Sequence, residues 1–293
     1  MRLLIVSGCV LLACSGNYVW GDEMSERDKL QAAAMFYASF DEAAQGDFGE
    51  GIKQFSTRFN HESKAGEFVF EKGFDDKVFR IAPQKGIHGG ALEVVDVLPR
   101  NGRIYFPAHQ NIAFKPGGWS GAASMWLNTN PNELLKTTFC DPLQMTQFGA
   151  HNGGLWVDFN NAKPRDMRMG AFTSLAVGQK PTPENDPQAP LIQLPAVPLK
   201  SGEWHHVVLN WQNFDTGKPD AQAELYLDGK RIGQLQNRTI SMNWDTQKAG
   251  LYVAVNYIGL LDEFSIFRRS LTAAEINRLY QEPGLLAPLK KQP

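Results

Sequence analysis

Short hydrophobic runs recur along this chain, and clusters of turn-forming residues separate them. Near the C-terminus, Leu260, Asp262, Phe264 and Ile266 alternate with the period of two that is typical of a half-buried strand. No comparably long helical pattern lies between the runs, so the sequence predicts an all-β sandwich of two antiparallel sheets. Strands are expected at 36–41, 67–70, 78–81, 86–95, 103–106, 118–127, 137–139, 145–148, 155–159, 167–172, 202–212, 223–232 and 259–267.

Two local signals fix details within this pattern. Asp228-Gly229 separates two strand-like runs, and glycine readily adopts the positive φ that a type I′ hairpin turn needs. Thr272 stands three residues before Glu275, directly ahead of the apolar Ile276 and Leu279. This spacing is a capping box, and it predicts a short helix after the closing strand.

Several of these segments resemble laminin-G-like, concanavalin A-like jelly-roll domains. The resemblance is carried by G-x-x-D-E-F-x-I-F-x-R-x-L-T-x-x-E-I-x-x-L-Y at 259–280, by G-x-W-H-H-V-x-x-x-W at 202–211, and by the strands at 86–95 and 118–127. It runs from about residue 36 to residue 281, and it implies a jelly-roll sandwich with a buried Trp126 and a structural histidine in the His205-His206 pair. Because this fold hosts lectins, glycan hydrolases and adhesion modules, it leaves the function open.

The start of the chain is typical of an export signal. Arg2 precedes an apolar run at 3–13, and a small residue, Gly21, offers a cleavage point, so residues 1–21 are predicted to be a signal peptide. Alternatively, cleavage occurs earlier, because Leu11-Leu12-Ala13-Cys14 resembles a bacterial lipobox. A lipid on Cys14 would then tether the protein to a membrane. We therefore expect an extracytoplasmic protein that is secreted, periplasmic or at the cell surface.

The remaining chain is expected to form one domain. Residues 22–34 are predicted to be a linker or short helix, 35–285 the jelly-roll domain, and 286–293 a tail. Six prolines interrupt residues 178–198, which are predicted to cross the surface as an insertion, because proline cannot donate to a strand ladder.

Composition narrows the functional classes. Hydrophobic residues make up 43% of the chain, enough for a sizeable core, and a net charge of −2 argues against a nucleic-acid partner. Of the three cysteines, Cys9 and Cys14 fall in the export signal. Cys140 is therefore predicted to be unpaired, as a small buried apolar residue rather than a nucleophile.

The sequence offers no clear catalytic centre. A glycan hydrolase needs two carboxyl groups about 5–9 Å apart, and no E-x-D-x-E or E-x-D-x-x-E spacing is found. Glu224 and Asp228 share a strand face, but Asp228 is explained by the hairpin turn. His205 and His206 are adjacent in a strand, so they point to opposite faces and do not suit one metal ion.

Calcium is the cofactor that the resemblance implies. Jelly-roll domains of this type hold calcium where the first and last strands meet, and Asp41 and Asp262 match the positions that supply side chains. The stretch Gly46-Asp-Phe-Gly-Glu-Gly51 departs from the family's usual loop, and Asp47 or Glu50 would have to replace its ligands. Calcium prefers six to eight oxygen ligands, and its role here would be structural.

Sugar binding would require an exposed aromatic ring beside polar side chains. Three groups satisfy this in sequence: Trp156 with Asp158 and Asn160, Trp244 between Asn243 and Asp245, and Tyr257 beside Asn256. The function predicted first is a non-catalytic carbohydrate-binding or adhesion module whose partner is a glycan or an envelope or matrix component. The alternatives are a protein-interaction scaffold that binds no sugar, and a glycan hydrolase or lyase with dispersed carboxylates.

Overall fold

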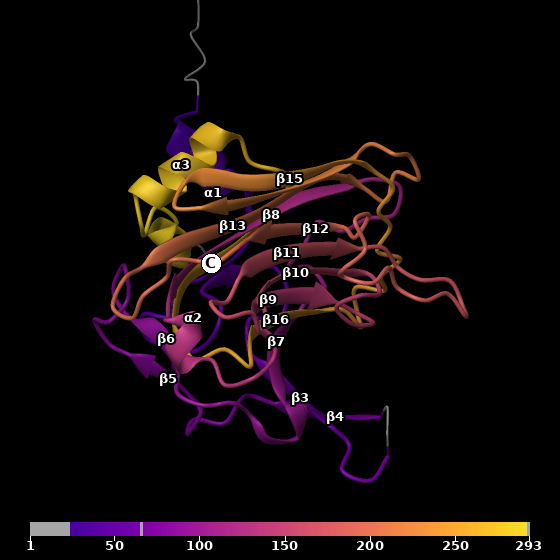
Figure 1. Cartoon of the computed structure of the whole chain (residues 1–293). Coiled ribbons are helices and arrows are strands. Elements are labelled where there is room, and N and C mark those ends of the chain that lie inside the picture. Colours follow the sequence, from indigo (N-terminus) through magenta and orange to yellow (C-terminus); the bar gives the residue numbers. More distant parts are fainter. Residues whose placement is uncertain (1–23, 65–66, 292–293) are drawn as a thin grey trace, which may run out of the picture.

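The computed structural model describes residues 24–64 and 67–291. The predicted signal peptide, including Cys14, lies outside the described residues. The described chain forms two antiparallel sheets that stack face to face, as the sequence predicts (Figure 1).

One sheet has nine strands among the described residues, in the order β15-β14-β13-β8-β17-β1-β2. β6 pairs with the first residues of β17 and β1 with its later ones, and β5 extends the sheet beyond β6. The strands are β1 (Ala34–Ala38), β2 (Phe48–Gly49), β5 (Phe79–Ala82), β6 (Ala91–Val94), β8 (Trp119–Asn128), β13 (His205–Phe214), β14 (Ala221–Leu227), β15 (Lys230–Arg238) and β17 (Gly259–Phe267).

The other sheet has eight strands among the described residues, in the order β12-β11-β10-β9-β16-β7-β3-β4. The last two strands, β3 and β4, project away from the body of the sandwich (Figure 1). The strands are β3 (Ser56–Asn60), β4 (Phe68–Lys72), β7 (Arg103–Pro107), β9 (Cys140–Thr146), β10 (Gly154–Phe159), β11 (Met167–Phe172), β12 (Leu191–Leu194) and β16 (Gly250–Val255).

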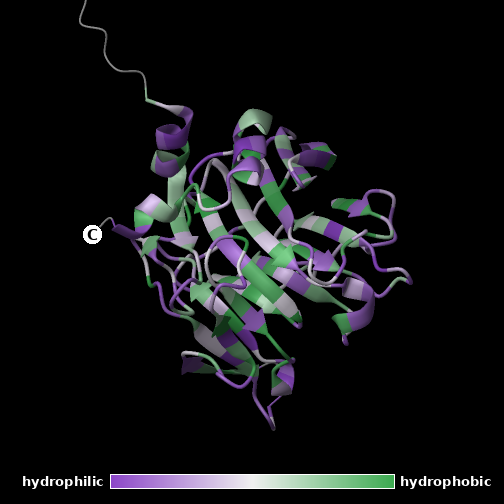
Figure 2. Ribbon diagram, turned by 90° about the vertical axis from the view of Figure 1, so that its left-hand side faces the viewer, coloured by the Kyte–Doolittle hydropathy of each residue, from purple (hydrophilic) through white to green (hydrophobic). Residues whose placement is uncertain are grey.

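The main core fills the space between the sheets, where apolar side chains from both inner faces meet. A second apolar cluster covers the outer face of the nine-stranded sheet, where α1 (Glu26–Ala33) and α3 (Ala273–Gln281) pack. The short elements α2 (Pro131–Leu134), η1 (Pro99–Asn101) and η2 (Ala287–Lys291) lie in connections and in the tail. Hydrophobic and hydrophilic residues alternate along the strands, as expected where one face of a sheet is buried (Figure 2). None of the described helices is long and apolar enough to cross a membrane.

The local sequence signals are confirmed. Asp228 and Gly229 both adopt positive φ between β14 and β15, as a type I′ turn requires. Thr272 and Glu275 form the predicted capping box at the start of α3. Cys140 is fully buried in the main core and unpaired.

The strands predicted at 137–139 and 145–148 were wrong, and the proline-rich stretch contains a strand that was not predicted. Residues 137–139 form no strand, and a single strand, β9, replaces the two expected at 137–139 and 145–148. The proline-rich stretch 178–198 contains β12, which pairs with β11 at the edge of the eight-stranded sheet. Pro190 and Pro195 flank this strand, so no proline interrupts its ladder.

The histidine pair is structural, as the resemblance implies. His206 is fully buried, its Nε2 lies 2.8 Å from Ser124 Oγ, and its ring contacts both Trp126 and the α3 residue Tyr280, which also stack on each other. His205 Nδ1 lies 2.9 Å from Asp228 Oδ2 in the hairpin turn. Burial lowers the pKa of His206 to about 3, because the charged imidazole would lose its hydration.

This burial predicts an acid-sensitive fold. The unfolded chain binds a proton at His206 near pH 6.5, whereas the folded chain excludes it, so His206 makes stability fall as the pH drops from about 6.5 toward 3. We expect His206→Gln to reduce the pH dependence of the free energy of unfolding by about 1.4 kcal/mol per pH unit below pH 6.5. Urea unfolding at pH 7, 6 and 5 measures this. His61→Gln, at a partly exposed site, is the matched control, and an equal loss of slope in both variants would contradict the prediction.

Candidate functional site

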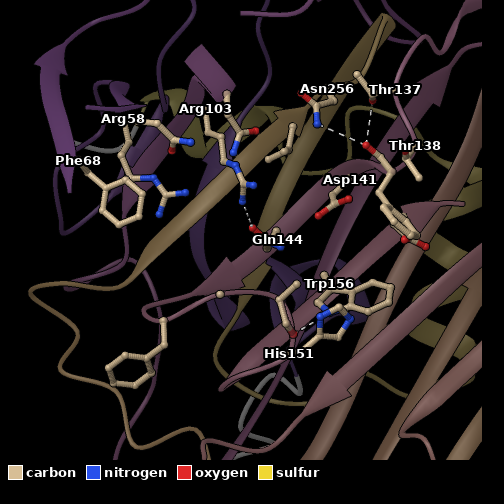
Figure 3. Close-up of a pocket in the computed structure, with 18 of the residues that line it drawn as sticks. Arg58, Phe68, Arg103, Thr137, Thr138, Asp141, Gln144, His151, Trp156 and Asn256 are labelled. Atoms are coloured by element: carbon tan, nitrogen blue, oxygen red, sulfur yellow. Dashed lines mark hydrogen bonds between the residues drawn. The ribbon is translucent and has the colours of Figure 1, made fainter. Parts of the chain in front are cut away.

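A groove runs across the outer face of the eight-stranded sheet. It consists of two hollows, of about 700 and 710 Å³, which share Arg58, Phe68 and Phe148 in their linings. Successive strand residues point to opposite faces. Ile104 and Leu143 therefore reach the core, while their neighbours in β7 and β9 line the groove (Figure 3). The outward side chains from five strands are Arg58, Arg103, Tyr105, Asp141, Gln144, Trp156, Asp158 and Tyr252.

Exposed apolar side chains form a rim around this groove. Among the described residues, seven large hydrophobic side chains are exposed, and five of them line one or both hollows. The exceptions are Met24 and Val177. The groove rim, as we call it, consists of Ile52, Phe68, Phe70, Phe139 and Phe148.

A partly buried ion-pair network contributes to the lining of the groove. Arg168 donates two hydrogen bonds to Asp158, at 2.9 and 2.6 Å, and one to Glu184 at 2.5 Å. The second Glu184 oxygen lies 2.7 Å from His151 Nε2. Glu184 belongs to the proline-rich stretch, so this network ties that stretch to β10 and β11.

The network sets the charge of its carboxyl groups. Burial raises the pKa of Asp158 to about 6, even though the hydrogen bonds from Arg168 favour the carboxylate. Burial also acts to raise the pKa of Glu184, but hydrogen bonds from Arg168 and His151 outweigh it and lower that pKa. Asp141, buried on the groove floor, forms no ion pair among the described residues. Burial and the neighbouring Asp158 raise its pKa well above the usual range.

Arg165 holds one wall of the groove in place. Its buried guanidinium donates to the carbonyl oxygens of Leu135, Thr137, Thr138 and Asn160, at distances of 2.7 to 3.4 Å. Thr137 and Thr138 line the groove (Figure 3). The segment predicted to be a strand at 137–139 is therefore an irregular wall, whose carbonyl groups bond to an arginine instead of a neighbouring strand.

Comparison with known proteins agrees with the two-sheet architecture. A family model described as the concanavalin A-like lectin/glucanases superfamily matches residues 101–277. The chain belongs to this superfamily. No curated protein sequence matches the chain.

Solved structures share the fold at low sequence identity. One such structure is domain 4 of AbnA, a GH43 extracellular arabinanase from Geobacillus stearothermophilus, in complex with arabinotriose. This domain is 16% identical to the chain, with a TM-score of 0.50. The match covers 85% of this chain and 100% of that domain. The binding domain of botulinum neurotoxin DC in complex with rat synaptotagmin II is 12% identical with a TM-score of 0.55. That of serotype D/C is 11% identical with a TM-score of 0.54. These two matches cover 86% and 88% of this chain but only 52% and 53% of the toxin domains.

Within this concanavalin A-like sandwich, two of the predicted sugar-binding residues lie together at the groove. Trp156 and Asp158 both line it, but neither is free for a ligand. Trp156 is only 2% exposed, and its Nε1 donates to the Ala150 carbonyl at 2.9 Å. Its indole lies over Gly170 of β11, where an added Cβ would come within 2.3 Å of the ring. Asp158 is held by Arg168, so the pair forms part of the floor.

The other three predicted sugar-binding residues do not line the groove. Asn160 donates to Asp166 at 2.9 Å. Trp244 is buried and donates to the Gly153 carbonyl at 2.8 Å, and the fully buried Tyr257 donates to the Leu260 carbonyl at 2.9 Å. The expectation of exposed rings was therefore wrong for both aromatic residues, because each one satisfies its polar atom inside the fold.

The rim phenylalanines were missed, because phenylalanine in a strand-like run is more often a core residue. One signal was present in the sequence. Phe68 and Phe70 alternate with Val69 between charged residues, so one of the two sets had to face outward from the β4 hairpin.

The carboxylates predicted to bind calcium do not assemble around one position. Asp41 and Asp262 lie at one corner of the sandwich, where they accept hydrogen bonds from the amides of Gly90 and His88 at 2.7 and 3.2 Å. Asp47 accepts the Ser39 amide at 2.7 Å. No three acidic, histidine or cysteine side chains of the described residues form a metal-binding group.

A lysine supplies positive charge at this corner. Lys290 of the C-terminal tail forms an ion pair with Asp41. The described arrangement therefore does not fit a preformed calcium site, and calcium binding stays a prediction.

The buried Arg165 gives the first of two predictions for this part of the structure. Arg165→Met would leave its carbonyl acceptors without a donor, and we expect the free energy of unfolding to fall by at least ~3 kcal/mol. Urea unfolding measures this loss. Arg238→Met is the matched control, because Arg238 is partly exposed and its side chain bonds only to Gln188 among the described residues. Equal stability of the two variants would contradict the structural role of Arg165.

The Lys290–Asp41 ion pair gives a second prediction. Lys290→Met removes a partly buried counter-charge, and we expect a loss of about 1 kcal/mol, with added calcium restoring part of it by binding the freed Asp41 carboxylate. Thermal unfolding with calcium and with chelator measures both effects, and Lys291→Met is the matched control. A calcium-dependent rise in the melting temperature of the unaltered protein would show instead that calcium binds despite the lysine.

Proposed function

We propose that the protein is a non-catalytic carbohydrate-binding module that acts outside the cytoplasm, and that the groove on the eight-stranded sheet holds the glycan. The observation that carries this proposal is the groove rim. Phenylalanine rings can stack on the apolar faces of sugar rings, and five exposed apolar side chains at one groove are more than scattered surface residues would give.

The groove floor provides the polar partners that a sugar needs. Asn256 offers a partly exposed amide group, and Tyr105 offers a partly exposed hydroxyl group. Hydroxyl groups of a bound sugar would exchange hydrogen bonds with these side chains while the rim covers the ring faces. The hollows, at about 700 Å³ each, are large enough for several sugar units.

The state of the groove carboxylates favours binding over hydrolysis. Asp158 and Glu184 are both engaged by Arg168, which leaves Asp141 as the groove carboxyl without an ion pair among the described residues. Hydrolysis requires a second free carboxylate at about 5–9 Å. A hydrolase or lyase is therefore the weaker reading of this groove.

The fold neighbours and the chain start are consistent with this proposal. Domain 4 of the extracellular arabinanase is a domain of the same fold solved with a bound oligosaccharide. The export signal predicted at residues 1–21 would deliver the module to a glycan of the envelope or matrix. Fractionation of cells that produce the full chain would test this location.

A protein partner is the second candidate, and the same rim favours it. An exposed apolar patch also suits a protein surface, and the neurotoxin DC binding domain was solved with the protein synaptotagmin II. The two candidates differ in the ligand that Phe68 and Phe148 contact.

The glycan proposal predicts a specific loss of binding. Phe68→Ala and Phe148→Ala each remove one rim ring, and we expect each variant to bind the retained polysaccharide about tenfold more weakly. The measurement is retention of the purified protein on insoluble and immobilised polysaccharides, with calcium and with chelator. Val177→Ala, which trims an exposed apolar side chain away from the groove, should bind like the unaltered protein.

Retention of no polysaccharide by the unaltered protein would contradict the proposal and favour a protein partner. Release of soluble sugars from a retained polysaccharide would contradict the non-catalytic role. In that case Asp141→Asn would be the first variant to test, because Asp141 is the groove carboxyl without an ion pair among the described residues.

A further inference from the structure

Two arginines face each other in the middle of the groove. Arg58 of β3 and Arg103 of β7 are direct cross-strand partners, and both side chains point into the groove, close together (Figure 3). Like charges placed directly opposite each other across two strands destabilise a sheet. Such a pair persists only where something else offsets the repulsion.

Neither guanidinium has an anionic partner among the described residues. Arg58 donates one hydrogen bond, to the Tyr252 hydroxyl at 3.4 Å, and Arg103 donates one, to Gln144 Oε1 at 2.8 Å. The Nε atoms of both arginines are buried without any hydrogen-bond partner. Each side chain therefore retains most of its five-donor capacity unused.

The other charged groups of the groove do not neutralise this pair. Asp158 and Glu184 are committed to Arg168. Lys64 adds a further positive charge at the rim, paired with the exposed Glu67. Asp141 is the remaining acidic neighbour. It attracts Arg103 but forms no ion pair with either arginine, and burial raises the pKa of Asp141, which disfavours its charged form.

An aromatic surface adjoins the two arginines. The Arg58 guanidinium carbon lies 4.2 Å from the centre of the Phe68 ring and 4.9 Å from that of Tyr252. Stacking on these rings fixes the plane of the guanidinium, which prepares it for a flat two-oxygen acceptor. A carboxylate has this shape and charge, and arginine binds it with two parallel hydrogen bonds.

We propose that the Arg58–Arg103 pair is a subsite for the carboxylate of an acidic sugar, so that the glycan bound in the groove contains uronic acid units. This inference rests on the proposed glycan function and names its ligand class. The sugar ring packs against Phe68 or Phe148, and its carboxylate offsets the repulsion between the two arginines.

The test compares acidic polymers with matched neutral ones. Polygalacturonate, alginate and hyaluronan are each measured by affinity electrophoresis and calorimetry, beside fully methyl-esterified polygalacturonate, neutral arabinan and a neutral glucan. We expect the dissociation constant for at least one uronate polymer to be about tenfold or more below that for every neutral polymer, since hydrogen bonds to charged groups are the strong ones. Dextran sulfate distinguishes the source of the anion, and tighter binding of this polymer than of any uronate would overturn the carboxylate assignment.

Variants separate the subsite from general charge attraction. Arg103→Gln and Arg58→Gln should each abolish the preference for the acidic polymer while binding of neutral polymer changes less than about twofold. Arg80→Gln on the nine-stranded sheet removes the same charge far from the groove lining and should keep the preference. An equal loss in all three variants would overturn the subsite.

The outcomes also separate this inference from the function on which it rests. Binding of neutral and acidic polymers with equal affinity, lost in Phe68→Ala, would overturn the acidic subsite and leave the glycan function standing. Binding of no polymer at all would overturn both. Thermal unfolding of each variant verifies that it is folded before its binding is compared.

Discussion

The core between the two sheets is the constraint on which the groove depends. Each strand must turn alternate side chains inward to build this core, and the remaining side chains then have to face outward. In β10, the inward positions hold Leu155 and Val157, while Trp156 and Asp158 face the groove. A shift of one residue in this register would bury the charged side chains and expose the apolar ones, so the polar content of the groove follows from the same pattern that stabilises the fold.

The arginines at the groove are of two kinds, one with acidic partners and one without. Arg168 is buried and donates hydrogen bonds to both oxygens of Asp158 and to one oxygen of Glu184. These bonds offset the cost of removing the charges from water. Arg58 and Arg103 are less buried and lie side by side. Arg58 donates only to the hydroxyl of Tyr252, and Arg103 donates only to the amide oxygen of Gln144. Structural stability explains the first arrangement, because it ties the proline-rich stretch to the sheet. Stability does not explain why Arg58 and Arg103 lie side by side, whereas binding of an external anion does.

Sequence reasoning reached the fold more readily than the site, for a physical reason. The hairpin at Asp228-Gly229 and the capping box at Thr272 and Glu275 involve residues that are close in sequence, and their geometry is decided locally. The pairing of Arg58 with Arg103 depends on the register of two strands 45 residues apart in the chain, one of which, β3, has no clear hydrophobic signal.

Burial of aromatic residues is equally non-local. Trp156 stands next to polar residues in the sequence, as a sugar-binding ring would. The side chain nevertheless lies flat over Gly170, its partner on β11, and stacks on Phe172, which hides it. Phe68 looks like a core residue but lies on a hairpin that projects beyond the sandwich, so it stays 45% exposed although Arg58 packs on its ring. Exposure of a ring depends on what packs over it, and a single sequence does not show this.

The placement of the helices explains why the groove lies on one sheet and not on the other. Ile276 and Leu279 of α3, together with Leu30 of α1, cover the outer face of the nine-stranded sheet, where they meet Val208 and Tyr226. Its buried polar side chains, among them Ser124, His206 and Asn210, bond within the fold, so that face offers no open groove. Neither α1 nor α3 covers the outer face of the eight-stranded sheet, so side chains on that face stay accessible at the groove. Arg168 neutralises the carboxylates of Asp158 and Glu184 on this face. The positive charges of Arg58 and Arg103 have no such partner, and both side chains line the groove, where a ligand has access.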